Sequence, residues 1–98
     1  MKAPDQCESL QDVRTEIDRL DFNIIKLLAE RSAYVKAAAR FKRDLNAVAA
    51  PERLRTMLED RWRWAAEHSL SPEFVDALYR QITDYFIGEE GKHLTSRM

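Results

Sequence analysis

The segment from Ser9 to Phe41 contains neither glycine nor proline and keeps a helical repeat along its length. The apolar residues of this repeat follow one another at spacings of three and four, and they are Leu10, Val13, Ile17, Leu20, Ile24 and Leu27. Ser9, with Asp12 three residues later, resembles a capping box at the start of a helix. Such a helix is roughly 48 Å long, far beyond the typical length of about 11–12 residues. A 98-residue chain has no core that long, so we expect a second chain to cover much of this stripe.

Two further helices are predicted after this one. Pro51 suits the first position of a helix because it has no N–H to leave unpaired. Ser71 and Pro72 predict the N-cap and first turn of another helix, which we expect to fray near Gly91. The segment between the first two helices loses the repeat and is predicted to be a loop. The sequence therefore predicts an all-α fold of three helices in a single domain, residues 1–98.

Composition narrows the possible functions. A net charge of −1 gives no electrostatic footprint for nucleic acid, and no segment resembles a secretion signal or a membrane span. The single cysteine, Cys7, lies in a predicted N-terminal tail and cannot form an internal disulfide, which is typical of a cytoplasmic protein. His68 and His93 are isolated, and neither a metal-binding spacing nor a phosphate-binding loop is found. We expect neither a metal nor a cofactor.

Two cations interrupt the apolar stripe. Arg31 falls where the repeat requires an apolar residue, and Lys42 follows 11 residues later, roughly 16 Å along a helix axis. Either these cations pair with acids of another helix, or they bind an anion. Val35 and Ala38 lie between them, one as an apolar wall and the other leaving room. Such an arrangement suits a small, ring-like dianion.

Arg14 is a third candidate, at the edge of the same stripe. It precedes Arg31 by 17 residues, roughly 25 Å of helix, so one small ligand cannot contact both within one chain. An antiparallel dimer would bring Arg14 of one chain near the middle or the far end of the long helix of its mate. The competing interpretation is an exposed ion pair between Arg14 and Asp18, four residues later.

The remaining candidates are Arg53 and an acid near the C-terminus. Arg53 lies in the first turn of the second predicted helix, where a cation opposes the helix dipole. Glu89 and Glu90 both extend the inward face of the third, and periodicity does not choose between them. Because no nucleophile–base set is found, any chemistry would depend on binding and electrostatics.

These residues resemble a known family. The order Arg14, Arg31, Lys42, Arg53 and Glu90 on three helices, with the local matches "IDRLD", "YVKAAARFK", "APER" and "PEFV", is similar to the all-helical chorismate mutase family. The resemblance covers almost the whole chain. It implies an intertwined homodimer with two equivalent sites, in which Arg14 of each chain completes the site formed by the other four residues of its partner.

Within that family the chain is most similar to the isochorismate-pyruvate lyases, the salicylate-forming enzymes of siderophore pathways. The resemblance implies that Arg14 and Arg31, helped by Arg53, bind the two carboxylates of isochorismate. It further implies that Lys42, closing with a mobile loop over residues 43–49, reaches the ether oxygen. The side chains implied to line the ring are Val35, Ala38, Met57 and Ile87.

Three positions bear on which reaction is catalysed. Ala50 and Leu54 occupy positions that are acidic in the mutases, which favours the lyase and its cofactor-free pericyclic elimination. Glu90 replaces the glutamine of the lyases, and a carboxyl group donates a hydrogen bond to the breaking ether only when it is protonated. Some mutases carry glutamate here, so a chorismate mutase that forms prephenate stays an alternative. A non-catalytic helical dimer that binds a partner is the other.

Overall fold

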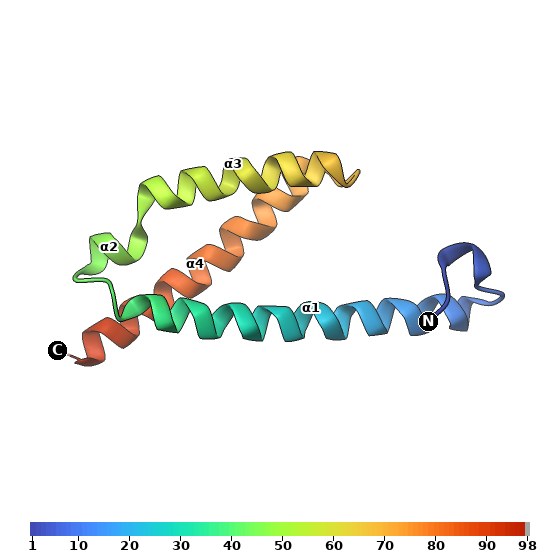
Figure 1. Ribbon diagram of the computed structural model, residues 1–98, viewed down its shortest axis with the longest axis horizontal. Helices are drawn as coiled ribbons and strands as arrows, with labels where there is room; N and C mark the ends of the chain where they lie inside the picture. Colours follow the sequence, from blue (N-terminus) through green and yellow to red (C-terminus); the bar gives the residue numbers. More distant parts are fainter. Residues whose placement is uncertain (98) are drawn as a thin grey trace. The chain divides into compact units, whose positions relative to one another are not determined.

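The computed structural model describes the backbone of residues 1–97 and the side chains of residues 1–92, so the side chain of His93 lies outside the described part. Every regular element in that part is helical (Figure 1). The elements are η1 (Pro4–Gln6), α1 (Leu10–Ala39), α2 (Leu45–Ala49), α3 (Pro51–Glu67) and α4 (Pro72–Arg97). The predicted all-α class, with three main helices and a long first one, is confirmed. In the described residues no helix is long and apolar enough to cross a membrane.

Internal contacts divide the chain into two compact units, Met1–Tyr34 and Val35–Met98. The boundary falls within α1, so the unit boundary is not a linker. The assignment of residues 1–98 to one domain stays a prediction.

The first unit contains η1 and most of α1. The 30 residues of α1 correspond to about 45 Å of helix. Ser9 caps it as predicted, because its Oγ accepts the Asp12 N–H at 3.0 Å. In a complete capping box the Asp12 carboxylate would accept the N–H of Ser9 itself. Here it accepts the N–H of the preceding residue, Glu8.

The apolar stripe of α1 is exposed in the single chain. The exposed fractions of its six residues range from 38% at Val13 to 62% at Leu10. An exposed apolar row of this length is typical of a protein–protein contact surface. It agrees with the expectation that a second chain covers the stripe.

The second unit has its core where α3 packs against α4. Its buried apolar side chains include Val48, Met57, Leu58, Ala65 and Val75. The Arg61 guanidinium links the two helices, because it lies 5.0 Å from the Trp64 ring of α3 and 5.1 Å from the Tyr79 ring of α4. This packing holds α4 in place and thereby positions the residues near its C-terminal end.

The placement of Lys42 on the helical stripe is wrong. The helix α1 ends at Ala39, and Lys42 follows in the connection to α2. The last turn tightens because the N–H groups of Phe41 and Lys42 bond to carbonyls three residues earlier, at 3.0 and 3.3 Å. Periodicity gives a residue's direction only while the helix continues, so the stripe did not determine where Lys42 points.

The predicted loop over residues 43–49 is largely a helix, α2. Asp44 has an extended backbone and its Oδ1 accepts the Ala47 N–H at 2.8 Å, which makes it an N-cap rather than a turn residue. Ala50 ends α2 in the left-handed region, with φ 41°, and leads directly into Pro51. One α2 face packs on α4. Asp44 is thus an N-cap signal that lies within the segment predicted to be a loop.

The starts of α3 and α4 agree with the sequence prediction. Pro51 and Pro72 each occupy the first helical position, and Ser71 Oγ accepts the Phe74 N–H at 3.2 Å. The predicted fraying near Gly91 is wrong, because α4 continues to Arg97. A glycine inside a helix costs only about 1 kcal/mol relative to alanine, which does not suffice to end a helix that packs against other elements.

Candidate active site

An ion pair between Lys42 and Glu90 is the central polar contact of the second unit. Lys42 Nζ lies 2.7 Å from Glu90 Oε2, although the two residues are 48 positions apart in the sequence. The exposed fraction is 7% for the Glu90 side chain and 24% for that of Lys42. The carboxylate is therefore buried and paired, and the ammonium group is its counter-ion.

The structure decides between the two neighbouring glutamates. Glu90 is buried and turned toward Lys42, whereas Glu89 is exposed and lies 3.4 Å from Lys92. For Lys42 the structure shows the first of the two alternatives given for the interrupting cations, a pair with an acid of another helix, and its role toward an anion stays a prediction. Because Glu90 balances the charge of Lys42 in the free chain, the site is less positive than its cationic residues alone would make it.

Arg14 and Arg53 are exposed, each on a helix surface. Among the described residues neither forms an ion pair, and the predicted pair between Arg14 and Asp18 is absent. The acid nearest Arg53 in its own turn, Glu52, is bound by Arg55 at 2.7 Å. Both guanidinium groups therefore remain available to an external anion.

The other predicted site residues are more covered. Arg31 on α1 is half-buried, as are Val35, Ala38 and Ile87. Met57 is 4% exposed and belongs to the core between α3 and α4. The substrate-binding roles of these residues stay predictions, because they require a bound ligand and a partner chain.

Sequence reasoning missed a group of polar residues at the N-terminus. The Lys2 ammonium group lies 2.9 Å from the Asp12 carboxylate, and the Lys2 backbone N–H donates to Glu16 at 2.8 Å. The pKa of Asp12 is lowered by the Glu8 N–H and by Lys2, and the pKa of Lys2 is raised by Asp12. Cys7 lies in this segment and is half-buried, so the predicted N-terminal tail is structured.

Comparisons with known proteins agree with this arrangement. Residues 13–91, a range that includes every predicted site residue, match the family described as chorismate mutase type II. The chain is also 46% identical over 93 residues to a protein of Pseudomonas aeruginosa named isochorismate pyruvate lyase, and the match covers 95% of this chain and 92% of that protein. The family match extends over most of the sequence, and the chain belongs to the chorismate mutase type II family.

Proposed function

We propose that this chain is an isochorismate pyruvate lyase, which converts isochorismate to salicylate and pyruvate without a cofactor. The observation that carries the proposal is the 46% identity to a lyase of that name along 95% of the chain. The geometry adds a cation, Lys42, held by a buried acid in the second unit. The single cysteine further supports a cytoplasmic location for the enzyme.

We infer that the active unit is a homodimer. The exposed stripe of α1 supports this inference, because pairing two such stripes would remove six large apolar side chains of each chain from water. The exposed Arg14 supports the further inference that each site is shared between chains. Arg14 of one chain would then bind substrate held by Arg31, Lys42, Arg53 and Glu90 of its partner.

The proposed reaction is a concerted elimination. A hydrogen moves from the ring to the methylene carbon of the enolpyruvyl group while the ether C–O bond breaks, which yields an aromatic ring and pyruvate. The protein supplies no base, so its work is to hold the reactive conformer and to stabilise charge on the ether oxygen. Arg14, Arg31 and Arg53 hold the carboxylates, and Lys42 is directed at the ether oxygen. Val35, Ala38, Met57 and Ile87 line the ring.

The Lys42–Glu90 pair sets a condition on that reaction. A bound dianion would compete with the Glu90 carboxylate for Lys42, and two negative groups around one ammonium group repel each other. An uncharged group at this position, such as the amide of Glu90→Gln, removes this repulsion and can donate a hydrogen bond to the ether oxygen. We therefore expect Glu90→Gln to bind isochorismate more tightly than the unaltered enzyme.

A chorismate mutase is the second candidate function. The family description and the acid at position 90 favour it. Ala50 and Leu54 disfavour it, because neither offers a polar group to a ring hydroxyl.

The deciding experiment supplies isochorismate and chorismate separately to the purified protein. We expect salicylate fluorescence and an equal amount of pyruvate from isochorismate, with at most weak formation of prephenate from chorismate. Faster turnover of chorismate would establish the mutase instead. A non-catalytic dimer would turn over neither compound, and a cyclic dicarboxylate would not raise its melting temperature.

A further inference from the structure

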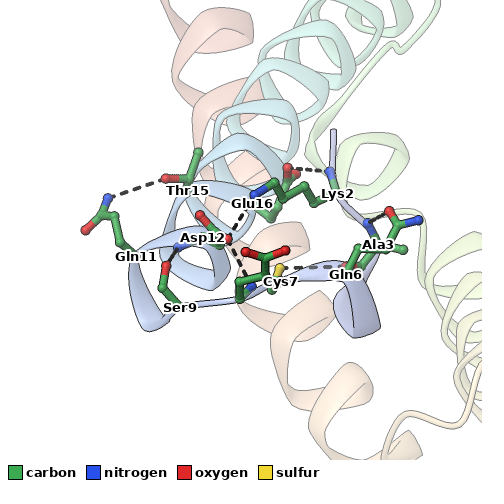
Figure 2. Close-up of polar contacts among 10 residues, drawn as sticks. Lys2, Ala3, Gln6, Cys7, Ser9, Gln11, Asp12, Thr15 and Glu16 are labelled. Atoms are coloured by element: carbon green, nitrogen blue, oxygen red, sulfur yellow. Dashed lines mark hydrogen bonds and ion pairs between the residues drawn. The ribbon is translucent and has the colours of Figure 1, made fainter.

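Residues 1–9 fold back against the start of α1 and form a segment that we name the N-terminal hook. Figure 2 shows its side chains around the first turns of the helix. The hook contains the 3-10 turn η1, in which the Gln6 N–H donates to the Ala3 carbonyl at 2.9 Å and the Gln6 side chain accepts the Ala3 N–H at 3.0 Å. It is therefore a structured element with internal hydrogen bonds.

The hook is joined to α1 by four hydrogen bonds or ion pairs that involve side chains. Lys2 binds the Asp12 carboxylate through Nζ and the Glu16 carboxylate through its backbone N–H, at 2.9 and 2.8 Å (Figure 2). The Glu8 N–H also donates to Asp12, and Ser9 Oγ accepts the Asp12 N–H, both at 3.0 Å. These contacts tie the first two turns of the helix to a segment that precedes it.

Arg14 lies within the first two turns of α1, which the hook contacts. The first four N–H groups of a helix, counted from the N-cap, have no partner within it, and in α1, with Ser9 as the N-cap, they belong to residues 9–12. Ser9 satisfies one of them, since its Oγ accepts the Asp12 N–H, and its carbonyl accepts the first bond of the helix, from the Val13 N–H. Arg14 follows directly after Val13, so fraying of the uncapped end would displace it.

The hook supports this turn without covering the guanidinium group. Asp12 and Glu16 each lie two positions from Arg14, and residues two apart on a helix project to different sides. Arg14 is exposed. The hook thus restrains the backbone of the turn while the Arg14 side chain stays accessible to a partner chain.

We propose that the N-terminal hook is a positioning element for Arg14, which fixes the turn that presents this guanidinium to the substrate in the partner's site. The proposal rests on the proposed function, in which Arg14 completes that site. Lys2, Ser9 and Asp12 act through Arg14 and do not touch the substrate.

The first test compares the double variant Lys2→Ala/Ser9→Ala with the unaltered enzyme in the lyase assay. Because a substrate-binding arginine becomes less well placed, we expect KM for isochorismate to rise about 3- to 10-fold with kcat within about 2-fold. Arg63→Ala, which removes an exposed ion pair with Asp60 on α3, is the matched control and should change neither constant. Lys2→Arg retains the charge that binds Asp12 and should retain the original KM.

A mixed dimer then separates positioning from general stability. One chain carries Lys42→Ala and the other Arg14→Ala, so the single intact site uses Arg14 of the first chain and Lys42 of the second. The hook substitutions placed on the first chain should raise KM as they do in the uniform dimer. The same substitutions on the second chain, whose Arg14 is already absent, should leave KM unchanged.

The outcomes separate the two proposals. An equal rise in KM from either placement, or no rise from both, would overturn the positioning role while the lyase assignment stands. If the unaltered enzyme forms no salicylate, the proposed function fails. If the uniform enzyme is active but the mixed dimer, shown to have formed, is inactive, Arg14 does not act across chains and the hook proposal fails with it.

Discussion

Replacing Lys42 with alanine should damage both stability and catalysis, for different reasons. In the free chain the substitution leaves the Glu90 carboxylate, whose side chain is 7% exposed, without its counter-ion at 2.7 Å. Removing one partner of a fully buried pair costs about 3–5 kcal/mol. Because the Lys42 side chain is 24% exposed, water compensates part of this cost and we expect a loss of about 2 kcal/mol in the free energy of unfolding. In catalysis, loss of the cation at the ether oxygen should lower kcat by about 10²–10³-fold.

A second substitution distinguishes the two effects. Glu90→Gln removes the unpaired charge, so Lys42→Ala/Glu90→Gln should recover most of the lost stability at neutral pH but not the lost kcat. Urea unfolding at fixed protomer concentration gives the free energies, and salicylate fluorescence under saturating isochorismate gives kcat. If Lys42→Ala retains kcat, or if the double variant recovers it, Lys42 does not stabilise the ether oxygen. If Lys42→Ala is as stable as the unaltered protein, the pair does not contribute as the geometry implies.

Three further outcomes follow from the same contacts. Glu90→Gln should lower KM for isochorismate, because it removes a negative charge that competes with the dianionic substrate for Lys42; an unchanged or raised KM would exclude this competition. Leu20→Glu, in the middle of the exposed α1 stripe, should convert the dimer to monomers in sedimentation and abolish turnover. The control Arg63→Ala should stay dimeric. A Leu20→Glu protein that is still dimeric would place the interface elsewhere. Because the pKa of Asp12 is lowered in the folded chain, its contribution to stability is present above the ordinary carboxyl range and is lost as the pH falls through the lowered value. From about pH 4 downward, Asp12→Asn should therefore lose less unfolding free energy than the unaltered protein. Parallel curves of unfolding free energy against pH would contradict this.

The sequence by itself determined the helices and most of their starts. The repeat of α1, the Ser9 cap and the prolines at positions 51 and 72 are local signals, in which a residue acts on neighbours within about four positions. Interruptions of the helical pattern singled out cations such as Arg31 and Lys42, whereas the family resemblance added Met57 and Ile87 and assigned the roles. The roles of Arg14, Arg31 and Arg53 stay predictions. The glycine and proline pattern did not give the C-terminal ends of α1 and α4. The helix α1 ends at Ala39 with no glycine or proline beside it, and α4 continues through Gly91, whose cost of about 1 kcal/mol is too small to end a helix.

Only the tertiary structure decided which side chains meet. Lys42 and Glu90 are 48 residues apart, and their contact depends on where α1 ends and on how α4 packs against α2 and α3. Chain reversals likewise decide that Glu90 rather than Glu89 contacts Lys42, and that Lys2 contacts Asp12. A periodic pattern gives the direction of a side chain within its own helix but carries no information about the element opposite it. The partner of a charged residue is therefore a property of the folded chain.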